Sequence, residues 1–376
     1  MIRNTDCVVA DKLYQKGGFH RLVGHLRTNI VFGTASIAAL LLSIAVLFGY
    51  LSTAPSANTL RLGFFPNVTH AQALFGMATN TYQEALRQVH GFDFVVQPRA
   101  FNAGRFAIQA LLANQVDLVF VGPSPTLSGL AAAGPDELRV IAGAASGGAS
   151  FVIQPSINLA TDADFADRKF ATPQLGNTQD IALKHYLLTR GHQTRDRGGD
   201  VDVINAANAD ILALFQLGRI DGAWVPEPWA TRLVLEANAH LFLDERSLWP
   251  KGQFVTTHLV TTKRYLDEHR DILKTFLGAY VNVTLRLQRA TASDLVTVNG
   301  QITNATGIHL SQDIIDRAFM NLNVTYDPIG SSLATYLAWA KDLGFIPRAT
   351  DATSLYDLTL LNEILGGKGL PPVAGI

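Results

Sequence analysis

Hydrophobic and polar positions divide this chain into one long apolar segment near the N-terminus and an alternating pattern after it. Residues 30–50 carry no charged side chain, and a helix of this length spans the ~30 Å hydrocarbon core of a bilayer. Lysine and arginine outnumber aspartate in the preceding segment, 1–29, which predicts that this segment stays in the cytoplasm. We therefore expect a transmembrane helix at 30–51 and a main body outside the cytoplasm, in the periplasm or at the cell surface.

A cleaved signal sequence is the alternative to an anchor. The apolar run is longer than the roughly 7–15 residues typical of a signal peptide, which favours the anchor. Small residues at 52–54 offer a cleavage site, but Pro55 follows them directly and hinders cleavage. The single cysteine, Cys7, precedes the apolar run, so lipid attachment at a cysteine after that run is excluded.

Strand and helix patterns alternate from about residue 58. Strands are expected at 60–65, 92–101, 117–122 and 138–144, and helices at 70–89, 104–115 and 127–133. The third strand is a continuous apolar run, as expected where helices cover both faces of a parallel sheet. This order predicts a doubly wound parallel sheet.

The pattern then restarts, which predicts a second unit. Its strands are expected at 169–172, 201–205, 222–225 and 240–243, and its helices at 179–189 and 209–217. A β-branched strand at 254–261 is expected to return to the first unit. Helices at 265–288, 312–320, 333–343 and 354–365 complete the chain. We therefore expect an α/β body with two lobes and a central cleft, divided into 58–150, 151–252 and a return to the first lobe over 253–376.

Composition narrows the classes of function. The formal net charge is −1, and no run of lysine or arginine occurs, so nucleic acid is not an expected partner. The body has no cysteine and its histidines lack metal-ligand spacing; His258 is expected to pack within its strand. No nucleotide-binding or hydrolase motif occurs, so we expect no cofactor, no metal and no enzymatic activity.

Candidate ligand-binding residues follow the predicted strands at helix N-termini. There, unpaired backbone N–H groups and the helix dipole favour an anion without a counter-charge. The side chains placed there are Asn67 or Thr69, Ser124 (an N-cap before Pro125), Asn177 or Thr178, and Asn208. A single Ser or Asn cap is more often structural, but these recur in both units. Two helix N-termini from opposite lobes can therefore hold one oxyanion between them.

A further candidate is the segment 221–229, in which two prolines flank Glu227. One interpretation makes Glu227 a ligand-facing carboxylate beside an aromatic wall that includes Trp224. The other pairs Glu227 with Arg232 and places the tryptophans in the core. The sequence leaves both open.

Several of these segments resemble one family in the order in which they occur. They are LRLGFFPNVTHAQAL, VDLVFVGPSP, PQLGNTQDIALKHYL, WVPEPW and FVTTHLV. They resemble the solute-binding proteins of ABC importers, in the nitrate, sulfonate and taurine branch, which shares a superfamily with thiamine-pyrimidine-precursor proteins. The resemblance covers about 60–280 and implies a type II periplasmic-binding-protein-like fold.

The resemblance also implies a ligand, partners and site residues. The ligand would be a small oxyanion, an aliphatic sulfonate or taurine, and the partners a membrane permease and its ATPase. The resemblance adds His70 and Gly148 to the candidate ligand-binding residues. A taurine-like ligand would place its ammonium at Glu227. Nitrate, bicarbonate or a pyrimidine precursor are alternative ligands, and a membrane-tethered sensor is an alternative role. A pyrimidine-precursor enzyme is disfavoured because the body lacks cysteine.

Overall fold

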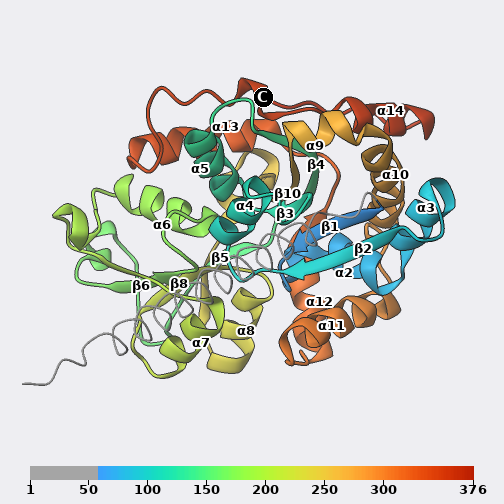
Figure 1. Ribbon diagram of the computed structural model, residues 1–376. Coiled ribbons are helices and arrows are strands. Elements are labelled where there is room, and N and C mark those ends of the chain that lie inside the picture. Colours follow the sequence, from blue (N-terminus) through green and yellow to red (C-terminus); the bar gives the residue numbers. More distant parts are fainter. Residues whose placement is uncertain (1–57) are drawn as a thin grey trace, which may run out of the picture. The chain divides into compact units, whose positions relative to one another are not determined.

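Two β-sheets form the framework of residues 58–376, the part of the chain that the computed structural model describes (Figure 1). The predicted transmembrane helix at 30–51 and the segment before it lie outside the described residues. Within 58–376, no helix combines the length and the hydropathy needed to cross a bilayer.

The first sheet has the strand order β11-β4-β10-β3-β1-β2. Its strands are β1 (Thr59–Phe64), β2 (Val95–Ala100), β3 (Leu118–Val121), β4 (Leu138–Gly147), β10 (Val255–Thr262) and β11 (Leu322–Val324). β1 runs parallel to β2 and to β3, whereas β10 lies between β3 and β4 and runs antiparallel to both. The predicted return of the 254–261 strand to this unit is confirmed. The prediction of a wholly parallel sheet is wrong, because the returning strand enters in the opposite direction.

The second sheet repeats this arrangement in the order β7-β6-β8-β5-β9. Its strands are β5 (Ala149–Ile153), β6 (Lys169–Thr172), β7 (Asp202–Asn205), β8 (Gly222–Pro226) and β9 (His240–Asp244). β6 is parallel to β7 and β8, and β5 is antiparallel to β8 and β9. The antiparallel strand of each sheet, β5 or β10, is thus the one that enters directly from the other sheet. We call each sheet with its covering helices a lobe; the division at 150/151 and 252/253 stays a prediction.

Helices cover both sheets and fill the connections. The α-helices are α2 (Ala71–Ala78), α3 (Thr81–His90), α4 (Gly104–Leu112), α5 (Pro123–Ala133), α6 (Thr178–Leu188), α7 (Asn208–Gln216), α8 (Trp229–Ala237), α9 (Lys263–Glu268), α10 (Arg270–Leu287), α11 (Ala292–Thr306), α12 (Gln312–Met320), α13 (Gly330–Asp342) and α14 (Thr359–Gly367). The 3-10 helices are η1 (Val68–His70), η2 (Asp162–Phe165), η3 (Arg195–Arg197), η4 (Glu245–Leu248), η5 (Pro250–Gly252) and η6 (Thr353–Leu355).

Four helical regions differ from the predictions. The expected helix at 354–365 is replaced by the 3-10 helix η6 (Thr353–Leu355) and the α-helix α14, which begins at Thr359. The expected helix at 70–89 is divided by Asn80, whose φ of 55° is a left-handed conformation that asparagine tolerates. The expected helix at 265–288 is divided at His269. The helix α11 was not predicted, because its Thr, Asn and Val residues have low helix propensity. A capping box between Thr291 and Asp294 fixes its start.

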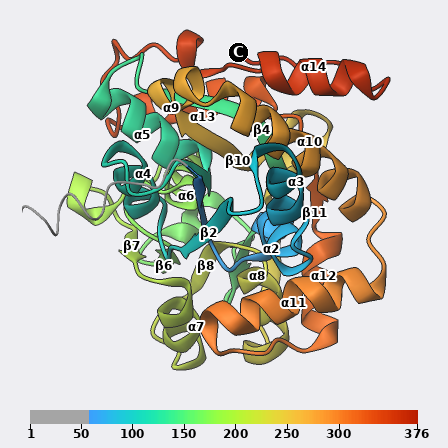
Figure 2. The ribbon, with the colours of Figure 1, turned by 45° about the vertical axis from the view of Figure 1, so that its right-hand side comes forward.

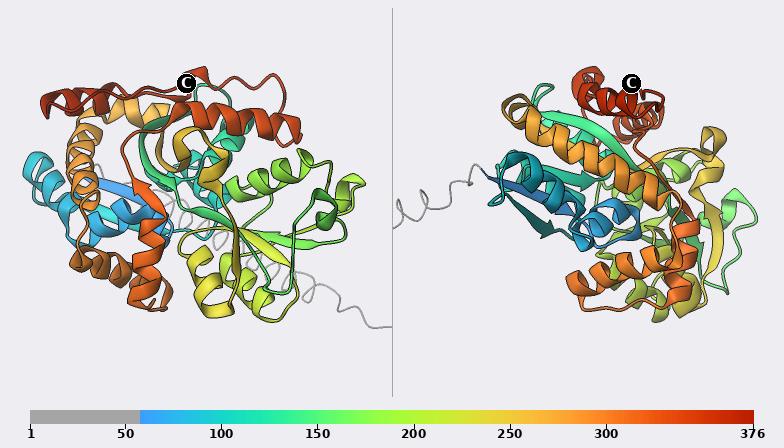
Figure 3. Two further views of the ribbon diagram at one scale, coloured as in Figure 1. Left: turned by 180° about the vertical axis from the view of Figure 1, so that it is seen from behind. Right: turned by 90° about the vertical axis from the view of Figure 1, so that its right-hand side faces the viewer.

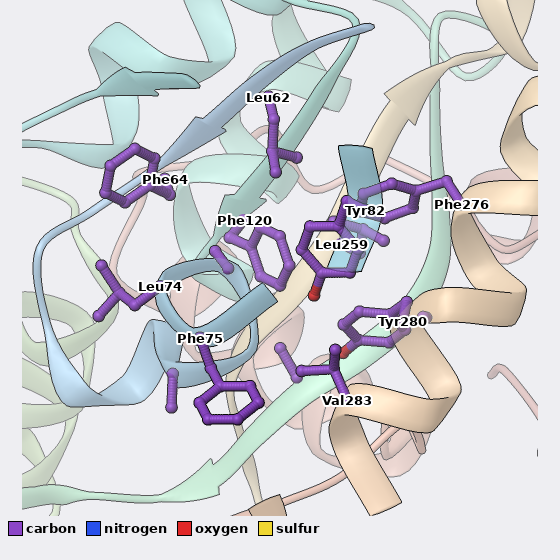
Figure 4. Packing of buried hydrophobic residues seen from close by; sticks show 14 of the residues in the cluster. Leu62, Phe64, Leu74, Phe75, Tyr82, Phe120, Leu259, Phe276, Tyr280 and Val283 are labelled. Carbon is purple, nitrogen blue, oxygen red and sulfur yellow. The ribbon is translucent and has the colours of Figure 1, made fainter. Parts of the chain in front are cut away.

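Aromatic and aliphatic side chains from distant segments form the core of the first lobe (Figure 4). Phe120 of β3 and Leu259 of β10 are fully buried beside Phe276 and Tyr280 of α10. The Tyr280 hydroxyl donates to the backbone oxygen of Gly143 in β4. Because each fully buried side chain of this size contributes about 1.5–3 kcal/mol, this core holds the strand ends that carry the site in place.

Two helical elements connect the lobes. α11 packs against α2 of the first lobe, and α12, which follows it, packs against α8 of the second (Figure 2). α13 packs against α5 of the first lobe and α6 of the second (Figure 3, left). These helices contact both lobes and therefore limit how far one sheet can move relative to the other.

Candidate functional site

A cavity of about 380 Å³ lies between the two sheets, at the ends of their strands. Its walls come from the connections that follow β1, β2, β3, β6, β7 and β8, together with residues of β10 and the end of α11. Strand C-terminal ends in open α/β sheets are where ligands generally bind. The predicted cleft is therefore present as a lined cavity.

The helices α5, α6 and α7 begin at this cavity, as do α2, directly after His70, and α8, at Trp229. α5 begins after Gly122 and α7 after Ala207, and neither has a side-chain cap. α6 begins after Asn177, whose side-chain oxygen accepts from the N–H of Thr178. The next amide along, that of Gln179, has no acceptor within its own helix. Together these N-termini supply backbone donors and a positive dipole potential from both lobes.

The N-termini of α5 and α6 approach one another closely. A Cβ atom on Gly122 would lie 2.6 Å from the Thr178 hydroxyl oxygen. That hydroxyl is buried, and neither it nor the side-chain oxygen of Asn208 has a hydrogen-bond partner within the described chain. Buried polar atoms of proteins are almost always paired, and each of these can pair with a ligand group in the cavity, the hydroxyl as a donor and the amide oxygen as an acceptor.

His70 contributes a neutral donor. Its Nδ1 accepts from the backbone N–H of Phe65 at 3.3 Å, which places the ring proton on Nε2. Burial lowers the pKa of His70 to about 3, so the ring is uncharged near neutral pH. The ring stacks on Phe65, with the centroids 4.7 Å apart. His70 can therefore present an N–H to an oxyanion without adding charge.

The cavity has both polar and apolar walls, and no described side chain on them carries a full charge. Within 58–376, its lining residues include no aspartate, glutamate, lysine or arginine. The nearest carboxylate in the sequence, Asp180, is fully buried and pairs with Lys184 at 2.8 Å. Asp180 also accepts from Thr172 and Asn205, both at 2.8 Å. An anion in this cavity would therefore meet neutral donors and helix N-termini only.

Six of the predicted ligand-binding residues line this cavity, and four do not. Asn67, Thr69, His70, Asn177, Thr178 and Asn208 lie together on its walls. Ser124 is the second residue of α5 rather than its N-cap, because the helix begins at Pro123; its hydroxyl is buried behind the wall without a partner in the described chain. Gly148 lies in the crossing between β4 and β5, where its φ is 71°.

Glu227 and Trp224 also lie away from the lining. Glu227 is buried and accepts from the N–H and hydroxyl of Thr231, both at 3.0 Å, and from Asn321 at 2.7 Å. The alternative pairing with Arg232 is not formed, because that guanidinium binds Glu236 at 2.9 Å. Trp224 is fully buried in the second lobe and stacks on Phe151, with the centroids 5.4 Å apart.

Trp229, which the sequence analysis did not select, lines the cavity. Its indole N–H donates to the side-chain oxygen of Asn67 at 3.1 Å, which orients the Asn67 amide. Trp229 is the first residue of α8 and follows the end of β8. Trp229 follows the end of a strand, whereas Trp224 lies within the strand. This difference in the sequence distinguishes the tryptophan that lines the cavity from the one in the core.

Metal ligation is not supported in this part of the chain. His258 is fully buried, and its Nε2 lies 2.8 Å from the Thr126 hydroxyl. Between residues 58 and 376, no cluster of His, Cys, Asp or Glu has the arrangement of a metal site.

Several known proteins are similar to this chain. The "Taurine-binding periplasmic protein" of Escherichia coli (strain K12) is 25% identical over 188 residues, which are 49% of this chain and 55% of that protein. The chain thus matches about half the length of this curated relative. The alkanesulfonate-binding protein SsuA from Xanthomonas axonopodis pv. citri, bound to MOPS, has a TM-score of 0.64 at 18% identity, covering 81% of this chain and 99% of that one.

The periplasmic nitrate-binding protein NrtA from Synechocystis PCC 6803 has a TM-score of 0.70 at 17% identity, covering 85% of this chain and 91% of that one. These two structures share the fold, which confirms the predicted two-lobed α/β architecture. The model of the NMT1-like family matches residues 53–298. The predicted resemblance to the nitrate, sulfonate and taurine branch of solute-binding proteins is confirmed, and the chain belongs to the NMT1-like family.

Proposed function

We propose that this protein is the extracytoplasmic solute-binding component of an ABC importer. It captures a small oxyanion, an aliphatic sulfonate, between its lobes and delivers it to a membrane permease driven by an ATPase. The predicted N-terminal anchor would keep the body at the membrane surface. Similarity to a taurine-binding periplasmic protein supports the class of function.

The observation that carries the proposal is the pair of helix N-termini that meet in an uncharged cavity. A sulfonate is anionic over the whole physiological pH range and has oxygen acceptors only. The amides of α5 and α6 and the Nε2–H of His70 are donors only, so the two sets match.

Cavity size favours a ligand with an organic part. The volume of about 380 Å³ falls within the range of pockets that bind small organic molecules. The apolar part of the cavity wall includes Phe65, Phe101 and Ile308. A bare nitrate ion has no apolar group to pack against these side chains. An ammonium group such as that of taurine would be expected to meet a carboxylate. The oxygens of Glu227 are already engaged by Thr231 and Asn321, so an uncharged tail fits better.

The lining also favours binding over catalysis. Its polar side chains are amides, hydroxyls and a neutral imidazole, and the described residues place no acid–base pair on the cavity. Mechanistically, a ligand that binds both lobes shifts the protein toward a closed arrangement, since only that arrangement makes all the contacts.

Thermal unfolding of the full-length protein with candidate anions tests the proposal. Butanesulfonate, taurine, nitrate, bicarbonate and phosphate would each be added in turn. A ligand at about 100 times its dissociation constant stabilises the folded state by about 2.7 kcal/mol. We expect the largest shift from butanesulfonate. Failure of every sulfonate to shift the transition would refute the proposal.

A further inference from the structure

The residues that line the cavity differ in burial. The buried ones include the polar residues Thr69, His70, Thr178 and Thr257, together with the apolar Phe101. The mouth is formed by exposed residues, namely Asn102, Ala207, Ala209, Ala305, Thr306 and Ile308. Ile308 is the one large apolar side chain in this exposed set, and it is 41% exposed. An anionic head bound by the buried polar residues would leave its tail directed toward Ile308.

Ile308 is held in place by a tightly bonded connection between α11 and α12. Gly307 ends α11 with a φ of 73°, which glycine adopts without strain, and donates to the Thr303 oxygen at 2.7 Å. The N–H of Ile308 donates to the Thr306 hydroxyl at 3.1 Å. Beyond it, the Asn299 side chain donates to the Leu310 oxygen at 2.7 Å. The connection therefore presents an exposed isoleucine from a fixed backbone.

The connection between α11 and α12 lies where the two lobes meet. In the sequence it follows the last residue that the family model matches. α11 packs on α2 of the first lobe and α12 on α8 of the second (Figure 2), and Ile308 of the connection lines the cavity. The NMT1-like model matches residues 53–298, which excludes 305–308. The buried polar walls thus belong to the part of the chain that the model matches, and this section of the mouth does not.

We propose that Ile308 is a specificity-determining residue that contacts the organic tail of the sulfonate, so that the connection between α11 and α12 selects the length and shape of that tail. This inference rests on the proposed function and deepens it. An exposed, preorganised apolar side chain gains burial only when a tail covers it. The protein therefore distinguishes sulfonates by their tails at Ile308, whereas the buried polar walls bind the shared head group.

Isothermal titration of the full-length protein with methanesulfonate and butanesulfonate tests this assignment. In the wild type, butanesulfonate binds more tightly than methanesulfonate. Ile308→Ala weakens butanesulfonate binding by about tenfold and methanesulfonate binding by less than about twofold. Ile308→Leu, which keeps the side-chain volume, retains most of the preference.

Val296→Ala is the matched control, because Val296 lies on α11 at 56% exposure and does not line the cavity. This variant leaves both affinities unchanged. An Ile308→Ala protein that keeps the wild-type ratio of the two affinities overturns the assignment of Ile308, while the proposed function stands. A wild-type protein that binds neither sulfonate overturns the proposed function and this inference with it.

Discussion

Thr178, at the start of α6, lies directly against Gly122, the N-cap of α5. A Cβ on Gly122 would come 2.6 Å from the Thr178 hydroxyl oxygen, closer than such contacts allow. The backbone of Gly122, with φ −74° and ψ 163°, is one that any residue can adopt. Glycine is therefore required there by the approach of the second lobe rather than by backbone conformation.

Gly122→Ala is expected to hold the two helix N-termini apart and to weaken sulfonate binding at least about tenfold. Thr178→Ala removes the hydroxyl that the new methyl group would meet. The next nearest atom, the backbone oxygen of Thr256 at 3.4 Å, is at an ordinary van der Waals distance. In the Thr178→Ala background the alanine at 122 therefore costs less. Titration calorimetry of the four proteins should give a coupling energy of about 1 kcal/mol or more.

Gly278→Ala in α10 controls for a general effect of replacing glycine, because a Cβ there meets no atom within 4 Å. It should leave binding unchanged. Equal losses from Gly122→Ala in both backgrounds would show that contact with Thr178 is not the cause.

We expect Glu227 to stabilise the contact between the lobes and not to bind the ligand. Its Oε1 accepts from Asn321, which precedes β11 of the first lobe, at 2.7 Å. Glu227→Gln should therefore leave the ratio of taurine to ethanesulfonate affinity unchanged within about twofold. It should lower the free energy of unfolding by about 1–3 kcal/mol, because buried donors lose a charged acceptor. A selective loss of taurine binding in the titrations would instead place the carboxylate at the ligand.

The sequence located most of the framework because hydrophobic periodicity is a local property. The strand predicted at 169–172 has the observed bounds of β6, and the predicted helix at 312–320 those of α12. The sequence does not predict β5, because its five residues directly follow Gly147 and Gly148, a pair typical of a connection. A strand that pairs only with segments far along the chain is not distinguished locally from a connection.

The residues of the site that lie at helix N-termini could be predicted from the sequence. Those whose position depends on the packing of the lobes could not. The α6 start at Asn177 and Thr178 carries a local cap signal, and both residues line the cavity. Which of Trp224 and Trp229 lines the cavity depends on which ring packs into the hydrophobic core, and this is Trp224. Ile308 carried no signal, because an isoleucine between two helices is unremarkable until the lobes are brought together.

Glu245 is expected to make stability fall as pH rises. It is fully buried, and it accepts from Trp224 at 2.8 Å, Trp249 at 3.3 Å and Tyr336 at 2.6 Å. Burial raises the pKa of Glu245 to about 7, although these hydrogen bonds oppose the shift. Between about pH 4.5 and 7 the folded state holds a proton that the unfolded state has lost. Stability from this group is therefore lost as pH rises through that window, by up to about 3 kcal/mol.

Glu245→Gln removes this titration. Urea unfolding at pH 5, 6, 7 and 8 should show the variant less stable than the wild type at pH 5, with a difference that narrows toward pH 8. Two curves that stay parallel over this range would mean that Glu245 does not take up a proton on folding.

His70 should make stability fall on the acid side while leaving the anion affinity independent of pH. Burial lowers the pKa of His70 to about 3, whereas an unfolded histidine titrates near 6.5. As pH falls below 6.5, the histidine binds a proton in the unfolded state but not in the folded state, so the free energy of unfolding decreases. At pH 5, one and a half pH units at 1.36 kcal/mol per unit give about 2 kcal/mol. Sulfonate affinity should stay constant from pH 5 to 8, because the ring remains neutral.

His258 provides the matched comparison, because burial also lowers the pKa of His258 to about 3 and this residue does not line the cavity. His70→Gln and His258→Gln should each reduce the loss of stability between pH 8 and pH 5 by about 2 kcal/mol. Only His70→Gln should alter butanesulfonate affinity. A rise in wild-type affinity as pH falls from 7 to 5 would contradict the neutral-donor role, since a ring that gains charge would attract the anion more strongly.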